Sequence, residues 1–299
     1  MTETLQARTP AGATPAGAGA ARRRGGRRGL LVSPWTYAAL VAVLAGSAFP
    51  VYWSFVVSSQ TPDAVDRVPP VLVPGGHLWA NIARVFDQTD FALALANSLI
   101  VAGTVTVSVV LFSTLAGFAF AKLKFRGRSV LMLVVVATQA IPTELGVIPL
   151  YMMMSDFGWA GELPSVIVPG LVTAFGVFFM RQYLQRAVPD ELLEAGRMDG
   201  CGTLRLFWHV VLPAARPAAA VLGLFTFMQA WNDFFWPLVV LVPENPTVQT
   251  ALSTLASGYS TDYTLVLTAA TIGTVPVLAV FLLFGRQIVG GIMHGAVKG

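Results

Sequence analysis

Charged and turn-forming residues gather in one segment of this chain, Glu191–Pro213, which reads ELLEAGRMDGCGTLRLFWHVVLP and lies between two apolar runs. A carboxylate at a fixed position on a short helix can form charge-assisted contacts with a partner protein. Glycine permits the tight turns that would hold such a helix in place. A docking surface is one interpretation of this segment. The plainer alternative is an amphipathic pair of helices that only connects two membrane spans.

Motifs for catalysis or metal binding are missing from the sequence. A Walker A loop needs Gly-Lys-Ser/Thr, and none of Lys122, Lys124 and Lys298 follows a glycine. Neither His-Glu-x-x-His nor Gly-x-Ser-x-Gly occurs, and the only thiol is Cys201, with three scattered histidines. We expect no catalytic residue, no metal site and no disulfide, so the chain is not expected to be an enzyme.

The composition predicts an all-α integral membrane protein. Of 299 residues, 55% are hydrophobic and only 11% charged, with a mean hydropathy of +0.69, which leaves too little polar surface for a soluble globule. A membrane-spanning helix needs about 20 apolar residues. Six runs qualify: Trp35–Val57, Leu95–Ala121, Val130–Met154, Leu163–Met180, Ala218–Val242 and Tyr263–Gly285.

The distribution of Lys and Arg predicts the orientation. With these six spans, 17 of the 19 cations fall in the N-terminal tail, the second and fourth connections and the C-terminal end. Short cytoplasmic loops are enriched in cations, so both termini are expected in the cytoplasm. This sidedness also explains the pI of about 9.5 without nucleic acid as a partner.

The first 29 residues form a separate region in this interpretation. They are rich in Ala, Gly and Pro, with arginines at 22–24, 27 and 28, and lack the apolar residues needed for a core. We expect a disordered basic tail over 1–29 and a transmembrane domain over 30–299. A cleaved signal peptide is the alternative, but the uncharged run Trp35–Val57 is longer than a usual signal core.

The connection at about 187–213 is predicted to be a helix–turn–helix at the inner membrane face. Pro189, Asp190 and Glu191 are typical of a helix start, and Gly200 and Gly202 of a stop and turn. The stretch TLRLFWHVV then favours a second short helix that ends at Pro213.

The spacing in this connection resembles the EAA loop of ABC importer permeases, especially the maltose-type carbohydrate family. That loop reads Glu-Ala-Ala, three residues, Gly, nine residues, then Ile-x-Leu-Pro. The matching positions here are Glu194, Ala195, Gly196, Gly200, Val210, Leu212 and Pro213, with Gly196 in place of Ala and Val210 in place of Ile. The resemblance runs from about Asn97 to the C-terminus and includes NSLIVA at Asn97, AFAKLKFRGR at Ala119 and WNDFFWPLVVL at Trp231.

The resemblance implies a permease subunit that works with a second permease subunit, an ABC ATPase dimer and an extracytoplasmic sugar-binding protein. ATP and Mg²⁺ would be bound by the ATPases, and this subunit would hold no cofactor. Glu194 is expected to dock with the ATPase and Gly200 to set the loop geometry. Asp199 either shares the docking or pairs with Arg197 or Arg205, and Lys298 and Gly299 are expected near the ATPase dimer.

Two acids inside apolar runs, Glu144 and Asp233, suggest the solute path. Ionisable groups at membrane depth are costly and usually functional. Both would lie about 15 residues, or roughly 22 Å, from the inner end of their spans. Asp233, with Asn232 and Trp231, is expected to line a polar cavity for a sugar. Alternatively, Asn232 and Asp233 pair with the second permease subunit, and Glu144 stabilises a kink beside Pro142.

Other readings stay open. The solute could be a polyol or glycerol phosphate in place of a mono- or oligosaccharide. A secondary transporter would need internal repeats and paired broken helices, which the sequence does not show. Finally, Ser113, Gly117 and Ala121 form a small-xxx-small face, which predicts a surface for packing against another helix.

Overall fold

The computed structural model describes residues 33–65, 67–257 and 261–296, with side chains described as far as Gly285. The chain divides into two compact units, Met1–Ala48 and Phe49–Gly299, so the boundary lies inside the first long helix. Apart from one isolated bridge between Gly161 and Leu241, the regular structure of the described residues is helical. The predicted disordered tail, 1–29, and the pair Lys298 and Gly299 lie outside the described residues.

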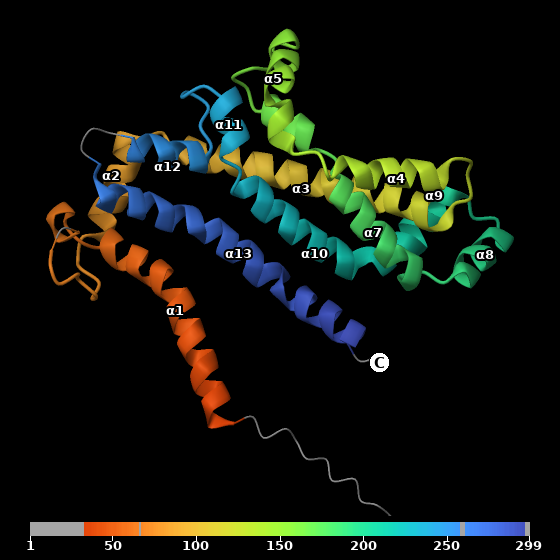
Figure 1. The fold of residues 1–299 in the computed structure, drawn as a ribbon, viewed down its shortest axis with the longest axis horizontal. Helices are drawn as coiled ribbons and strands as arrows, with labels where there is room; N and C mark the ends of the chain where they lie inside the picture. Colours follow the sequence, from red (N-terminus) through yellow and green to blue (C-terminus); the bar gives the residue numbers. More distant parts are fainter. Residues whose placement is uncertain (1–32, 66, 258–260, 297–299) are drawn as a thin grey trace, which may run out of the picture. The chain divides into compact units, whose positions relative to one another are not determined.

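Figure 1 shows the helices in chain order. They are α1 (Pro34–Ser58), η1 (Pro62–Ala64), α2 (Leu78–Gln88), α3 (Phe91–Lys122), α4 (Arg128–Thr138), η2 (Thr143–Gly146), α5 (Val147–Asp156), α6 (Pro164–Ile167), η3 (Val168–Gly170), α7 (Ala174–Ala187), α8 (Asp190–Met198), α9 (Thr203–Leu206), η4 (Phe207–Val211), α10 (Leu212–Trp231), α11 (Phe235–Val240), α12 (Val248–Ala256) and α13 (Tyr263–Ala296).

The lengths of these helices confirm the all-α membrane fold. Within the described ranges, five helical segments are long and apolar enough to span a bilayer, and the bent pair α4 and α5 raises the total to six. The five are Pro34–Ser58, Phe91–Lys122, Pro164–Ala187, Thr203–Trp231 and Tyr263–Gly285. The cytoplasmic position of both termini stays a prediction.

The third predicted span, Val130–Met154, is wrong as a continuous helix. The chain bends by 89° between α4 and the segment Thr143–Asp156. Proline has no N–H to donate and disfavours helical geometry in the residue before it. Pro142, at the break, therefore ends the first helical piece, and Glu144 lies in the short 3₁₀ turn that follows it.

The fifth predicted span, Ala218–Val242, is displaced. One continuous helix runs from Thr203 to Trp231, so Pro213 does not end a separate short helix. A π turn, Phe207–Val211, directly precedes α10, and this wider turn accommodates a proline that cannot donate to the carbonyl one turn back. The helix ends after Trp231, where the Met228 carbonyl accepts hydrogen bonds from both the Asn232 backbone N–H at 3.1 Å and the Asn232 side-chain amide at 2.8 Å.

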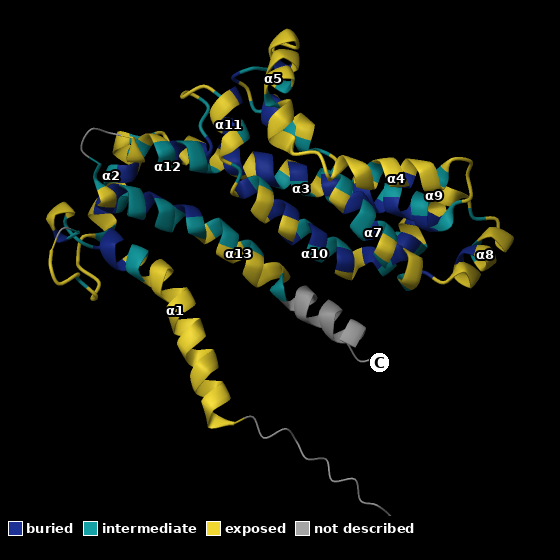
Figure 2. Ribbon diagram, in the orientation of Figure 1, coloured by how far each residue is buried: buried dark blue, intermediate teal, exposed yellow. Residues whose placement is uncertain are grey.

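Helices α3, α7 and α10 pack together around the main core, as the buried positions in Figure 2 show. Gly117 of α3 lies so close to α7 that a Cβ would come within 2.8 Å of the Met180 Cβ. In return, a Cβ on Gly176 of α7 would collide with the Ser113 hydroxyl. The predicted packing role of Ser113, Gly117 and Ala121 is confirmed, since all three are buried here.

A second core joins the opposite end of α3 to α2, α12 and α13. The Ser98 hydroxyl accepts a hydrogen bond from the Val248 N–H at 2.9 Å, and the Asn97 side chain donates to the Pro246 carbonyl at 2.9 Å. An ion pair of 2.6 Å joins Arg84 of α2 to Asp262, just before α13. The short helices α2 and α12, which hydropathy did not predict, thus close this end of the bundle.

Candidate functional site

The predicted docking segment begins with a well-formed short helix. Pro189 precedes α8 in an extended conformation, and Asp190 and Glu191 occupy its first turn, where negative charge is favourable to the helix dipole. Gly200 follows the helix with a φ of +77°, a conformation that suits glycine. The chain turns there, and the Cys201 N–H donates to the Gly196 carbonyl at 2.9 Å. The predicted helix and turn are confirmed.

One face of α8 packs against the next helix. Leu193 is buried in the main core together with Leu206. Gly196 faces the same leucine, because a Cβ at position 196 would lie 2.5 Å from the Leu206 Cδ2. The glycine that replaces the alanine of the EAA pattern therefore provides the space that Leu206 fills.

The other face of α8 is open. Glu194 and Ala195 are exposed, and the large apolar side chains of Leu192 and Met198 are 53% and 88% exposed. Asp199 directly follows the helix and is also exposed, without an ion pair in the part of the chain that the structure describes. A carboxylate beside exposed apolar side chains is typical of a protein interaction surface.

An ion pair fastens α8 to the end of α3. The Lys122 Nζ donates to the Asp190 Oδ1 at 2.8 Å and also lies 3.3 Å from the Gln185 carbonyl. The hydrogen bond and positive charge of Lys122 lower the pKa of the Asp190 carboxyl from its ordinary value. The Asp190 carboxyl is therefore ionised at neutral pH. Leu212 and Pro213, the last residues of the predicted loop, begin α10.

The four residues predicted for the solute path differ in burial and do not lie in one place in the fold. Trp231 is only 2% exposed and stacks on Phe227 with ring centroids 5.7 Å apart. Asn232 is exposed, Asp233 is half-buried in the break between α10 and α11, and Glu144 is exposed at the α4–α5 break. Both acids thus lie in helix breaks, and the expectation that they sit inside straight spans is wrong.

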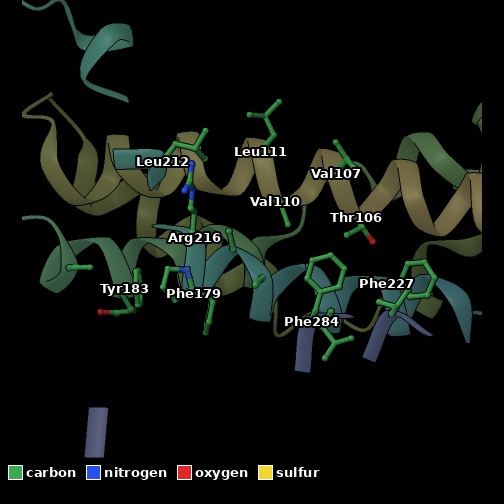
Figure 3. Close-up of a pocket in the computed structure, with 18 of the residues that line it drawn as sticks. Thr106, Val107, Val110, Leu111, Phe179, Tyr183, Leu212, Arg216, Phe227 and Phe284 are labelled. Atoms are coloured by element: carbon green, nitrogen blue, oxygen red, sulfur yellow. The ribbon is translucent and has the colours of Figure 1, made fainter. Parts of the chain in front are cut away.

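A cavity that the sequence did not predict lies between α3, α7, α10 and α13. It has a volume of about 1640 Å³ and a mainly apolar lining. Figure 3 shows Tyr183 and Arg216 toward one end, and Thr106 and Phe227 toward the other. The buried Thr106 hydroxyl has no hydrogen-bond partner among the described residues. Trp231, Asn232, Asp233 and Glu144 are not among the residues that line the cavity.

A sequence signal for this cavity existed in α3. Gly103, Thr106 and Val110 recur at helical spacing and line it together. A small residue and a hydroxyl on one face of an otherwise apolar helix indicate a surface that contacts something other than lipid. The contribution of α7 and α13 depends on tertiary packing and has no comparable local pattern.

Comparison with known proteins gives consistent matches. Residues 109–292 match the family described as "Binding-protein-dependent transport system inner membrane component". The sn-glycerol-3-phosphate transport system permease protein UgpE of Yersinia enterocolitica is 31% identical over 82% of this chain and 90% of its own length. The lactose transport system permease protein LacG of Rhizobium radiobacter is 33% identical over 84% and 91%.

A solved structure shares the fold. It is a bacterial ABC transporter involved in the import of the acidic polysaccharide alginate. The match has a TM-score of 0.72 and 24% identity, and covers 84% of this chain and 95% of the matched chain.

Proposed function

Because the chain belongs to the family of binding-protein-dependent transport system inner membrane components, we propose that it is the permease subunit of an ATP-driven sugar importer. It is a multi-pass protein of the inner membrane. Its partners in this proposal are a second permease subunit, a dimer of ABC ATPases that binds ATP and Mg²⁺, and an extracytoplasmic sugar-binding protein. The chain itself carries out no catalysis.

The single observation that carries the proposal is the geometry of α8. This helix is fixed on its inner side by Leu193 and by the Lys122–Asp190 pair, and it exposes Glu194 on its outer side. A short helix that is held firmly and still presents a carboxylate and apolar side chains is suited to docking. Glu194 is the residue that contacts the ATPase, and Ala195, Asp199 and the exposed Met198 complete the surface.

The connection from α8 to the bundle supports a coupling role. After the turn at Gly200, the chain enters the continuous helix Thr203–Trp231. A helix rises 1.5 Å per residue, so this one extends over about 43 Å. Movement of α8 by the ATPases is therefore passed directly to a helix that lines the cavity, and alternating access follows from its reorientation.

The cavity between α3, α7, α10 and α13 forms this chain's share of the solute route. Aromatic side chains such as Phe179 and Phe227 offer ring faces to a sugar, and Tyr183 and Gln182 offer polar groups. Asn232 and Asp233 lie in the break directly after α10 and would meet the solute at another stage.

The class of solute rests on the relatives. One matched relative is a lactose permease and another an sn-glycerol-3-phosphate permease, so a glycerol phosphate is the second candidate. Reconstitution of the assembly in proteoliposomes separates them. We expect ATP hydrolysis to rise with the binding protein and a mono- or oligosaccharide, and not with sn-glycerol 3-phosphate. Stimulation by sn-glycerol 3-phosphate and not by a sugar would make glycerol phosphate the assigned solute.

The test of the permease assignment is co-purification of the tagged protein in mild detergent. Wild type is compared with Glu194→Lys and with Glu191→Lys, an exposed position on the same helix with the same change in charge. We expect wild type and Glu191→Lys to retain an ABC ATPase and a second permease. Glu194→Lys should lose the ATPase and keep the permease. Wild type that purifies alone and still transports would contradict the proposal and favour a secondary carrier.

A further inference from the structure

A small basic pocket lies where α3, α4 and α7 meet, near the end of the bundle that carries α8. Its volume is about 520 Å³, and its lining includes Lys124, Gly127, Arg128, Ser129 and Arg181. Lys124 follows the α3 terminus, two residues after the lysine that pairs with Asp190. The pocket therefore lies at the water boundary of the membrane if the chain spans it as proposed above.

The three cations in this pocket are poorly neutralised. Arg181 has a buried Nε without a hydrogen-bond partner in the described part of the chain. Arg128 reaches only the Leu123 and Ala121 carbonyls, at 3.3 and 3.5 Å. None of the three takes part in an ion pair within the described ranges, and the pocket lining contains no acidic residue. Such a concentration of positive charge attracts an anion with several acceptor oxygens.

The start of α4 adds to this attraction. Gly127 precedes the helix with a φ of +79°, and no side chain caps the first turn. The free N–H groups and the helix dipole at such a terminus favour a negative group, phosphate in particular. The 11-residue helix and the three cations act on the same space.

The surface beyond the pocket is apolar, which indicates the source of the phosphate. Val130 lines the pocket, and Leu131, Leu133 and Val134 continue along α4 with about half or more of their area exposed. A free phosphate gains nothing from these side chains, whereas the acyl chains of a lipid do. We propose that the pocket binds the phosphate of an anionic phospholipid, with its acyl chains along α4.

This inference rests on the membrane orientation of the bundle in the proposed function, and it can be tested separately. The full assembly is reconstituted in nanodiscs of phosphatidylglycerol and phosphatidylcholine, and native mass spectrometry counts the lipids that it retains. The variants are Lys124→Gln and Arg181→Gln. The matched control is Arg126→Gln, an exposed position in the same connection that does not line the pocket.

We expect wild type and Arg126→Gln to retain phosphatidylglycerol in preference to phosphatidylcholine. Each pocket variant should weaken that retention about fivefold, the effect of one cation near an anionic lipid. Lys124 is exposed, so Lys124→Gln keeps the test valid if Arg181→Gln does not fold. Equal retention of the two lipids, or an equal loss in Arg126→Gln, would overturn the proposal.

Two competitors distinguish the sources of phosphate. Displacement of the lipid by inorganic phosphate would assign the pocket to a free anion. Displacement by sn-glycerol 3-phosphate would assign it to a solute. Either result overturns the lipid assignment. Loss of ATPase co-purification with lipid retention intact would count against the permease proposal and not against the lipid site.

Discussion

The carboxylate of Asp190, the first residue of α8, lies 2.8 Å from the ammonium group of Lys122, the last residue of α3. The Lys122 side chain is only 6% exposed, whereas that of Asp190 is 74% exposed. The described structure gives Lys122 no other anionic partner. The pair therefore connects the proposed docking helix to a helix of the main core through one charged contact.

Reversal of the charge at Lys122 alone should uncouple transport. We expect Lys122→Glu to reduce solute-stimulated ATP hydrolysis about tenfold, a typical size for coupling between sites, because two carboxylates would then face each other. The double variant Lys122→Glu with Asp190→Lys should recover most of the stimulation. Failure of the double variant to recover, with the ATPases still bound, would show that the contact is not the coupling element.

The lowered pKa of Asp190 predicts how this contact responds to acid. When α8 is detached, the Asp190 carboxyl has its ordinary pKa of 3.8, and when α8 is attached its pKa is lower. The stabilisation of the attached helix is thus complete above the ordinary pKa and is lost as pH falls through the lowered pKa. Hydrogen exchange of the α8 amides, corrected for intrinsic rates, should show constant protection across the neutral range. In Lys122→Met, the protection should be lower throughout that range.

Gly117→Ala should destabilise the bundle. The added Cβ would lie within 2.8 Å of both the Met180 Cβ and the Arg181 N, and backbone cannot move aside as a flexible side chain does. We expect a loss of about 1–3 kcal/mol in the free energy of unfolding. The control is Gly103→Ala on the same helix, where a Cβ meets nothing within 4 Å. Equal thermal unfolding midpoints in detergent for the two variants would contradict the close-packing argument.

Gly196→Ala, which restores the EAA pattern, should weaken the attachment of α8. Its Cβ would meet the Leu206 Cδ2 at 2.5 Å, so we expect about 1 kcal/mol of destabilisation. Leu206→Val combined with Gly196→Ala shortens the opposing side chain and should restore part of the lost stability. The measurement is the thermal midpoint of the three proteins, and a neutral Gly196→Ala would show that Leu206 moves aside freely.

Gly103→Trp should obstruct the cavity. Gly103 lines it and has open space where a side chain would begin, so an indole attached there would extend into the cavity. Uptake should fall about a hundredfold or more, because a bulky group in the route misplaces the solute, while co-purification of the ATPase stays normal. The control is Thr104→Trp, at an exposed position of the same helix. Equal uptake by the two variants would move the route elsewhere.

The sequence predicted those parts of the fold that depend on local chemistry. Apolar length identified the spans, and Pro189 and Gly200 marked the ends of α8, because a long apolar run and a restricted backbone act without distant contacts. The spacing of small residues placed Ser113, Gly117 and Ala121 at a helix interface, where the structure has them.

Where the prediction failed, the deciding interactions were tertiary or balanced between alternatives. A proline can end a helix, but a π turn accommodates Pro213 within a continuous helix. At Pro142 the chain bends sharply, although hydropathy predicted one continuous span. The cavity needs four helices from distant parts of the chain, and no local pattern places α13 beside α3 and α10. Trp231 resembled a solute contact but stacks on Phe227 in the core.

The π turn at Phe207–Val211 affects the direction in which the docking surface faces around the helix axis. Such a turn holds one more residue than an α-helical turn, and each helical residue advances by about 100°. The wider turn takes up this extra residue, so the sequence pattern shifts by one position across Phe207–Val211 while the helix on either side keeps its direction. Deletion of one residue here would give an ordinary α-helical turn and leave α8 in place. The π turn thus keeps Glu194 facing the direction that a straight α-helix one residue shorter would give it.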